Sequence, residues 1–360
     1  MAPVRIRKRV FVLLLVCLVG ASVIIGFDFL RRPPFLTGHI VKDSCSSAFS
    51  AVRREPNEPR VSSTVNIVQQ QKKDSAGNSP AVDQQPETDS PGIKPPVEVF
   101  QTTVSRDDHC TDLMIMGKRH GPIICTLNPK ECGMAEAIQR DHNWEGDKVD
   151  TAMKVMAKFD RDPLRGHVSL FDAGCNQGVF TITAAYLGYE VLAIDPVKKQ
   201  LELVATSLRK NNLTSKVTLV RNALSSDHRK VYIPQDITDL ADWYDPKANG
   251  QPPPDRVVDA VTMDDLIPLV RTERVFLKMD IERSEGRALR GASKFFDEIE
   301  VVCIFMEWEW VKRTEDDRRF ILKFLTTRGF EAYRQPTDKK PLNAESSMWW
   351  PHDVYWQKPN

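Results

Sequence analysis

The loop DAGCNQG at positions 172–178 has the composition of a cofactor-binding turn. A dinucleotide site needs Gly-x-Gly-x-x-Gly so that the backbone can approach a pyrophosphate, but Asn176 stands where the second glycine would be. The Gly-Lys-Ser/Thr ending of a phosphate-binding loop is also absent. A cofactor without phosphate, carrying an amino-acid end and a ribose, fits better, and S-adenosylmethionine is such a cofactor. We expect its amino-acid end to contact Asp172, Gly174, Asn176 and Gly178.

Two further polar positions follow at the ends of predicted strands. Asp195 comes 21 residues after Gly174 and is placed to accept hydrogen bonds from both ribose hydroxyls. Ala223 is predicted to lie on the adenine face, with Asn222 beside it. An Asp at a strand end is often only a helix cap, so the argument depends on finding loop and Asp in one βαβ unit.

A pair of acids marks the candidate catalytic position. Asp280 and Glu282 end the strand predicted at 274–281. Neighbouring carboxylates raise one another's pKa, which can prepare one of them as a general base. We expect Asp280 to be the base or to orient the acceptor, with Glu282 second. The same two acids, with Glu307, could instead bind a divalent cation; either acid could also simply cap the following helix.

Aromatic residues follow the next predicted strand. Trp308 and Trp310 come just after Glu307. Trp308 is a candidate substrate contact because aromatic rings stack on sugar faces, and Glu307 beside it is a second candidate. Packing in the core or in a lid is the alternative for the tryptophans. Three histidines precede the core and are more typical of solvated loops than of a catalytic base: His109, His120 and His142.

These candidates must be positioned by an alternating pattern of strands and helices. Strands are predicted at 168–172, 190–194 and 216–220, with helices at 179–187 and 197–211 between them. A β-α-β-α-β order is typical of a parallel sheet, whose ligands bind at the carboxyl ends of the strands.

The second half continues the pattern. Strands are predicted at 258–261, 274–281, 301–306, 330–334 and 353–357, with a helix at 315–327. The fold class is therefore α/β: a sheet of about seven mostly parallel strands, with helices on both faces and an antiparallel closing pair.

Several blocks of this half resemble the FkbM-type S-adenosylmethionine-dependent methyltransferases. LKMDIERSEGRALRGA is similar to the L-K-[IV]-D-[IV]-E-G-x-E signature, and FDAGCNQGVFTI to F-D-[VI]-G-x-N-x-G. Three more blocks follow in the family's order, within roughly 168–358: AIDPVKKQLELVATSLRKNN, NALSSDHRKVYI and VTMDDLI. The resemblance implies a Rossmann-like, class I methyltransferase fold and methyl transfer, usually to oxygen, and leaves the substrate open.

One position departs from the family. Arg283 stands where these proteins usually carry Gly, which can serve close backbone approach or a positive φ. An Arg beside the active site could contact an anionic acceptor; an ordinary surface Arg is the alternative.

The composition separates a folding part from the rest. All seven Trp and all six Tyr lie at or after Trp144, although the chain has 360 residues. The apolar run 10–27 follows a basic cluster, which predicts a cytoplasmic tail at 1–9 and a type II membrane anchor. A cleaved signal peptide is the alternative. Residues 28–99 are rich in Pro, Ser and Gln and are predicted to be a disordered stem.

The predicted layout continues with a cap at 100–166 and the methyltransferase domain at 167–360. Cys110, Cys125 and Cys132 could supply one disulfide in an oxidising lumen, with Cys45 as a further partner. Buried, inert thiols are expected at the cysteines inside the domain, Cys175 and Cys303. The sequon at Asn212 is a glycosylation candidate.

Together these features predict a secretory-pathway O-methyltransferase of the Golgi type, acting on a glycan hydroxyl. A lipid or a secreted small molecule is the alternative acceptor. A cofactor-binding lumenal interaction module without activity is a third hypothesis. Nucleic acid is not expected, because the net charge is only +1 and no basic aromatic groove is evident.

Overall fold

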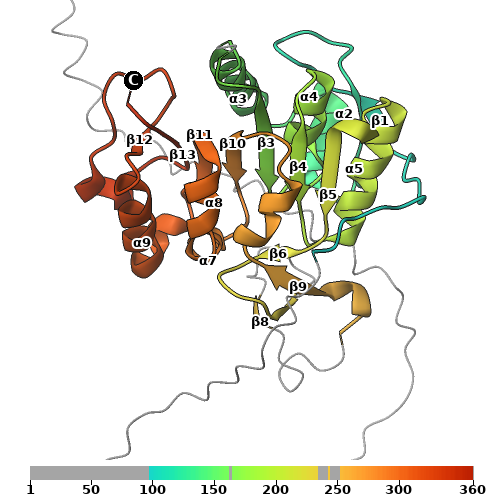
Figure 1. Ribbon diagram of the computed structural model, residues 1–360. Coiled ribbons are helices and arrows are strands. Elements are labelled where there is room, and N and C mark those ends of the chain that lie inside the picture. The colour runs from blue at the N-terminus through green and yellow to red at the C-terminus, as the bar shows by residue number, and fades with distance from the viewer. Residues whose placement is uncertain (1–96, 162–163, 234–241, 244–251, 360) are drawn as a thin grey trace, which may run out of the picture. The chain divides into compact units, whose positions relative to one another are not determined.

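The computed structural model describes residues 97–161, 164–233, 242–243 and 252–359 (Figure 1). The predicted tail, membrane anchor and most of the stem lie outside these residues. Within the described ranges, no helix has both the length and the apolar character needed to cross a membrane. The folded part includes the last residues that we expected to be stem, because Val99 forms an antiparallel bridge with Val220.

The centre of the fold is a seven-stranded sheet in the order β12-β13-β11-β10-β3-β4-β5. Its strands are β3 (Val168–Ala173), β4 (Val191–Ile194), β5 (Val217–Val220), β10 (Arg274–Met279), β11 (Glu300–Glu307), β12 (Glu331–Tyr333) and β13 (Asp353–Gln357). Only β13 runs antiparallel to both of its neighbours. This confirms the predicted α/β class, with a mostly parallel sheet of seven strands and an antiparallel closing pair.

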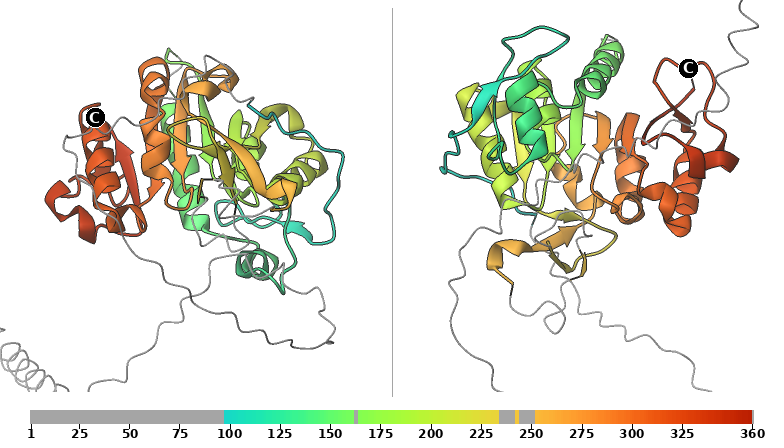
Figure 2. Two further views of the ribbon diagram at one scale, coloured as in Figure 1. Left: turned by 90° about the horizontal axis from the view of Figure 1, so that it is seen from below. Right: turned by 180° about the vertical axis from the view of Figure 1, so that it is seen from behind.

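Helices cover both faces of the sheet (Figures 1 and 2). One group is α2 (Gly133–Asp141), α3 (Gly146–Phe159), α4 (Val179–Tyr186) and α5 (Lys198–Lys210); the other is α7 (Glu285–Arg290), α8 (Ser293–Glu298) and α9 (Glu315–Thr326). Side chains alternate between the faces along β3, so Leu170 packs in the first group's core and Phe171 in the second's. A sheet covered on both faces needs continuous apolar strands, and all six residues of β3 are buried.

A smaller sheet follows at the carboxyl end of β5. It has the order β6-β9-β7-β8, with β6 (Ala223–Leu224), β7 (Lys230–Tyr232), β8 (Asp242–Trp243) and β9 (Val257–Val261). The strand predicted at 258–261 is therefore real, but it belongs to this sheet. Short 3-10 helices complete the connections: η2 (Thr214–Lys216), η3 (Pro254–Arg256), η4 (Asp264–Leu269), η5 (Val311–Arg313) and η6 (Ala344–Trp349).

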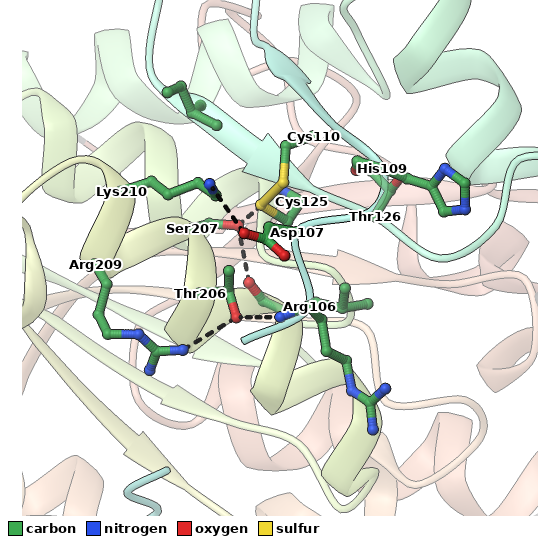
Figure 3. Close-up of a disulfide and its surroundings, with 12 residues drawn as sticks. Arg106, Asp107, His109, Cys110, Cys125, Thr126, Thr206, Ser207, Arg209 and Lys210 are labelled. Atoms are coloured by element: carbon green, nitrogen blue, oxygen red, sulfur yellow. Dashed lines mark hydrogen bonds and ion pairs between the residues drawn. A yellow bond between two sulfur atoms is a disulfide. The ribbon is translucent and has the colours of Figure 1, made fainter. Parts of the chain in front are cut away.

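An N-terminal hairpin, β1 (Cys110–Asp112) and β2 (Ile123–Cys125), packs on α5. A disulfide joins Cys110 to Cys125 across its strands (Figure 3). The amide of Cys125 donates to Ser207 Oγ at 2.8 Å, and the amide of Arg106 donates to Thr206 Oγ1 at 3.1 Å. The hairpin is thus fastened to the helix that follows β4.

The remaining cysteines agree with the sequence prediction only in part, because one disulfide was predicted for the cluster of three. Cys132 is disulfide-bonded as well. Cys175 and Cys303 are buried free thiols, and burial raises the pKa of both. The glycosylation candidate Asn212 is exposed in the turn after α5, with a positive φ of 58°.

Candidate active site

A pocket opens at the carboxyl ends of β3, β4, β5 and β10, with about 910 Å³ of empty space, part of it open to solvent. Its polar end is formed by Gly174, Asn176, Asp280, Glu282 and Ser284. Apolar side chains of Ile194, Val197, Leu224 and Ile233 line the other part, together with Asp195, Gln200, Asn222 and Ala223. Predicted cofactor residues and predicted catalytic acids therefore share one cavity.

The turn after β3 brings the backbone of the loop against the strand that carries Asp280. Gly174 has a φ of +79°, and a Cβ placed on it would lie 1.9 Å from the carbonyl oxygen of Asp280. Only glycine satisfies both constraints. Asn176 also has a positive φ, of 49°, which asparagine tolerates better than most residues. Asn176 thus adopts a left-handed conformation that glycine also adopts readily.

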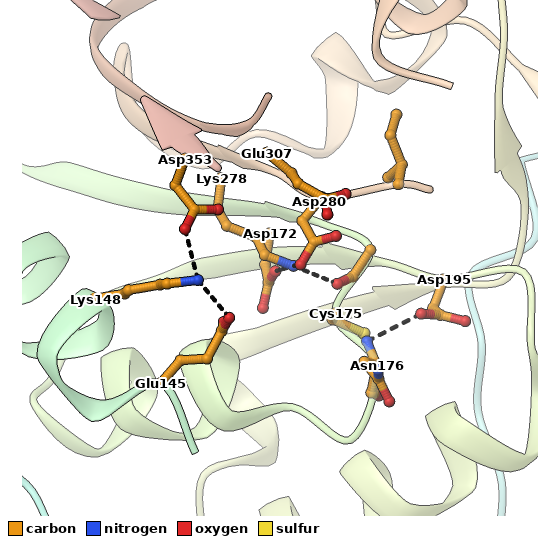
Figure 4. A network of polar contacts seen from close by, with 12 residues as sticks. Glu145, Lys148, Asp172, Cys175, Asn176, Asp195, Lys278, Asp280, Glu307 and Asp353 are labelled. Atoms are coloured by element: carbon orange, nitrogen blue, oxygen red, sulfur yellow. Dashed lines mark hydrogen bonds and ion pairs between the residues drawn. The ribbon is translucent and has the colours of Figure 1, made fainter. Parts of the chain in front are cut away.

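Asp195 ties the loop to the start of α5. Its carboxylate accepts hydrogen bonds from the amides of Asn176 at 2.9 Å and Val197 at 2.8 Å (Figure 4 shows the first). Burial raises the pKa of Asp195 to about 6, against the lowering effect of these amides. Each carboxylate oxygen has a second lone pair, so the side chain can still accept hydrogen bonds from a ligand in the pocket.

The side-chain amide of Asn222, which lines the pocket, joins two other backbone segments. Its Oδ1 accepts from the amide of Glu98 at 2.8 Å, and its Nδ2 donates to the carbonyl of Asp259 at 3.0 Å. The Asn222 amide is therefore used within the protein, while Ala223 beside it presents an apolar surface to the cavity.

A buried cation connects the two halves of the site. Lys278 is 4% exposed, and its Nζ donates to the carbonyl of Gly174 at 2.5 Å. The same ammonium lies 3.5 Å from Asp172 Oδ1 and 3.6 Å from Asp280 Oδ2 (Figure 4). These acids raise the pKa of Lys278 despite its burial. Sequence reasoning gave Lys278 no role, although a Lys inside the apolar run RVFLKMDI was a visible signal.

Three more carboxylates surround Asp280. Burial, and next the charge of Asp280, raises the pKa of Glu282 to about 7 and of Glu307 to about 10. The Glu282 residue is exposed at the rim of the pocket, whereas its carboxyl group has enough protein around it to be partly shielded from water. Burial also raises the pKa of Glu285 to about 8. Each of these three carboxyl groups therefore keeps its proton to a higher pH than an ordinary Glu side chain does.

The residues present fit S-adenosylmethionine. The bare backbone at Gly174 and the loop at Asn176 would hold its amino-acid end, and Asp195 its ribose through the lone pairs left free. Val197 and Ala223 would cover the adenine. The fit rests on a pocket that combines polar groups for the amino-acid end and the ribose with apolar side chains for the adenine, next to a glycine that no other residue can replace.

Comparison with protein families decides the class. Residues 172–332 match the Methyltransferase FkbM domain. The chain carries an FkbM methyltransferase domain. Together with the pocket just described, this makes the protein an S-adenosylmethionine-dependent methyltransferase.

Solved structures similar to this chain include other methyltransferases. An rRNA methylase from Streptococcus thermophilus is 13% identical, covers 60% of this chain and 96% of its own, and has a TM-score of 0.31. Precorrin-6y C5,15-methyltransferase from Geobacter metallireducens GS-15 is 13% identical, with coverage of 59% and 88% and a TM-score of 0.30. Cofactor-bound Rv0187 from MTB is 12% identical, with coverage of 61% and 82% and a TM-score of 0.34. These likenesses are too distant to bear on the acceptor. No curated protein matches the chain.

Two predicted cofactor residues of the FkbM domain lie outside the pocket lining. Asp172 is fully buried, accepts from Thr181 Oγ1 at 2.6 Å and faces Lys278. Gly178 begins α4, and a Cβ on it would lie 2.8 Å from a methyl group of Val204 on α5. Within residues 172–178 only Gly174 and Asn176 line the pocket, so Asp172 and Gly178 support the loop without lining it.

Trp308 does not offer a face for stacking on a sugar. It is fully buried, packs against Trp350 and Trp356, and donates from its indole nitrogen to the carbonyl of Ser347 at 2.8 Å. The core-packing alternative is correct here, because η6 and β13 fold over the end of β11. Glu307 is almost as deeply buried, beside Asp280 and outside the pocket lining (Figure 4).

The structure gives no support to the cation expected at Asp280, Glu282 and Glu307. Over the described ranges, no group of three or more His, Cys, Asp or Glu side chains has an arrangement that could hold a metal ion.

None of the three early histidines lines the pocket; His142, for example, caps α2 and contacts Asp112. Sequence reasoning missed His352 instead, which lies 3.6 Å from Glu307 Oε1. The hydrogen bond with Asp353 raises the pKa of His352, so this His and the carboxylates at the end of β11 interact.

Arg283 confirms that the family's glycine position demands an unusual backbone. Its φ is +71°, and that of Glu282 is +49°. A side chain in this left-handed region costs about 1–2 kcal/mol. The guanidinium carbon of Arg283 lies 4.0 Å from the ring centroid of Trp310, a cation–π contact of about 0.5–2 kcal/mol that offsets part of this cost.

Proposed function

We propose that the protein methylates an oxygen atom of a glycan hydroxyl, with Asp280 as general base or acceptor-orienting residue. The observation that carries the proposal is the position of Asp280. Its carboxylate stands at the carboxyl end of β10, and its backbone touches the cofactor loop at Gly174. A hydroxyl placed against Asp280 is therefore next to the polar end of the cofactor pocket.

Methyl transfer requires the protein to align the acceptor with the methyl group and to remove one proton. S-adenosylmethionine supplies the methyl group, and its sulfonium becomes a neutral thioether when that group is transferred. The hydroxyl oxygen forms the new carbon–oxygen bond and loses its proton, which Asp280 accepts and passes to water. A positioned base contributes about 10²–10⁴-fold. Lys278 holds Asp280 in place from below, so the carboxylate is aligned before the acceptor binds.

Several features support a lumenal site of action. The disulfide between Cys110 and Cys125, with a further bonded cysteine at Cys132, is typical of an oxidising compartment. The sequon Asn212 is exposed. The predicted type II anchor at 10–27 would place the enzyme in a Golgi or other secretory membrane, where glycans are the abundant hydroxyl-bearing acceptors.

Incubation of the full chain with methyl-labelled S-adenosylmethionine and a panel of glycans tests the proposal. We expect label in the glycans with the wild type, strong loss with Asp280→Asn, and no loss with Asp297→Asn on the exposed face of α8. Label found only in lipids or small molecules would reject the glycan acceptor. Cofactor binding without transfer to any acceptor would favour an inactive interaction module.

A further inference from the structure

Arg283 lies between two pocket-lining residues, Glu282 and Ser284. Its side chain is half-buried and covers the indole of Trp310, with 4.0 Å between the guanidinium carbon and the ring centroid. An interaction with the same indole lowers the pKa of Glu282, against the larger effect of burial. Arg283 is therefore held in one orientation at the rim of the site by contact with a fixed ring.

The charge of Arg283 lowers the pKa of neighbouring Glu282 but, within the described part of the chain, is not neutralised by a direct contact. Over the residues that the structure describes, its guanidinium makes no hydrogen bond and no ion pair. Arg313 is a useful contrast, since it stacks on the same indole at 4.5 Å but pairs with Glu309 at 2.6 Å. A guanidinium that contacts a ring through its face keeps its N–H edge free, and that edge matches a carboxylate or sulfate. The distance of 4.0 Å from the guanidinium carbon to the Trp310 centroid allows such a contact.

The backbone at this place is strained. Glu282 and Arg283 both have positive φ, although neither is glycine. Non-glycine residues in this region cluster at functional sites, where the strain is part of how a side chain is presented. Here the strained turn accompanies a guanidinium that lies over Trp310, while Glu282 lines the pocket.

We propose that Arg283, stacked on Trp310, binds an anionic group of the acceptor, a carboxylate or a sulfate on an acidic sugar. This rests on the proposed glycan methyltransferase function and names its substrate class. The carboxylate of Asp280 repels an anion from the depth of the site, whereas Arg283 attracts it at the rim. An acidic sugar is thereby oriented with its anion outward and a neutral hydroxyl toward Asp280.

Calorimetry on the full chain with S-adenosylhomocysteine tests the anion site without any turnover. The probes are the methyl glycoside of glucuronic acid, its carboxyl methyl ester, and a sulfated methyl glucoside. We expect one of the two anions to bind about tenfold or more tightly than the neutral ester, and the comparison of carboxylate with sulfate identifies the group. Equal binding of all three probes, or no binding of either anion, would overturn the proposal.

Variants assign the effect to Arg283. Arg283→Gln should remove the preference for the anion, Arg283→Lys should retain part of it, and Arg283→Gly should remove it while relaxing the backbone. Arg313→Gln is the matched control and should keep the preference within about twofold, because Arg313 already pairs with Glu309. An unchanged preference in both Arg283→Gln and Arg283→Gly would contradict the inference.

The two proposals can fail separately. Anion binding that depends on Arg283, without methyl transfer to any glycan, would reject the function and keep the binding site. Transfer to neutral and acidic glycans at equal kcat/KM, unaffected by Arg283→Gln, would keep the function and reject the anion site.

Discussion

The ammonium of Lys278 donates a hydrogen bond to the carbonyl oxygen of Gly174 at 2.5 Å. The same group lies 3.6 Å from the carboxylate of Asp280. One buried charge therefore connects the cofactor loop after β3 with the proposed base after β10. It also faces Asp172, so that both acids at the bottom of the site share this counter-ion.

Replacing Lys278 with Met should destabilise the protein and impair it as an enzyme. Removing one member of a buried ion pair leaves the other charge uncompensated and costs about 3–5 kcal/mol. We expect a lower free energy of unfolding in urea and weaker S-adenosylmethionine binding by calorimetry. Lys294→Met, at an exposed pair with Glu298, should change neither. A Lys278→Met variant as stable as the wild type would show that the cation is dispensable.

Asp280→Asn should separate binding from catalysis. The amide cannot accept the hydroxyl proton, so kcat should fall by about 10²–10⁴-fold. The pocket keeps its shape, and the affinity for S-adenosylhomocysteine should stay within a few-fold of the wild type. Steady-state rates and calorimetry on the same preparation measure both quantities. A kcat within threefold of the wild type would exclude Asp280 as the base.

Gly174→Ala should disrupt the cofactor pocket, whereas Gly188→Ala should not. Both glycines have positive φ, +79° and +97°, so each substitution strains the backbone similarly. Only at Gly174 would the new Cβ meet the Asp280 carbonyl, whereas none of the structure lies within 4 Å at Gly188. We expect loss of cofactor binding for Gly174→Ala alone, although both variants lose some thermal stability. Equal cofactor affinity in the two variants would contradict this.

Glu285 should make stability fall as the pH rises. Burial raises its pKa from 4.5 to about 8, so the folded protein keeps a proton that the unfolded chain releases. The free energy of unfolding then decreases between about pH 4.5 and 8, by at most about 1.4 kcal/mol per pH unit from this group. Glu285→Gln removes that dependence and keeps an oxygen to accept from the amide of Ile281.

Urea unfolding at pH 5, 6.5 and 8 measures this effect. The loss of stability from pH 5 to 8 should be smaller in Glu285→Gln than in the wild type. Glu298→Gln, on the exposed side of α8, serves as the control and should follow the wild type. Parallel curves for Glu285→Gln and the wild type would refute the assignment.

Removing the hairpin disulfide should destabilise the domain. Cys110 and Cys125 are 15 residues apart, and a cross-link of that length contributes about 3 kcal/mol by restricting the unfolded chain. The double variant Cys110→Ser, Cys125→Ser should therefore unfold at a lower temperature in a thermal melt. An unchanged midpoint would mean that the hairpin contributes little to global stability.

Much of the site could be predicted because its signals are local. Asp195 and Asp280 end apolar strands, and the carboxyl ends of parallel strands meet at one edge of the sheet. The turn at Gly174 is equally local, since its glycine is required by the path of the backbone. Reading the strands in order was therefore enough to place the loop and both acids beside one pocket.

Other residues depend on contacts between distant segments. Trp308 is buried because η6 and β13 close over β11, about 40 residues later in the chain. Ile233 lines the pocket and directly follows β7 of the small sheet. The periodicity of the sequence did not predict that sheet. Asp172 and Lys278 neutralise each other across neighbouring strands that lie 106 positions apart in sequence.

The sequence by itself determined the α/β class, the FkbM domain and the acids at the strand ends, because strand periodicity and turn geometry involve neighbours in the chain. Only the tertiary structure decided which side chains face the pocket. It turned Asp172 and Trp308 inward, and it brought Lys278 to Gly174 and Arg283 to Trp310. Burial and charge pairing depend on what another segment places opposite a residue, and that is a property of the folded chain.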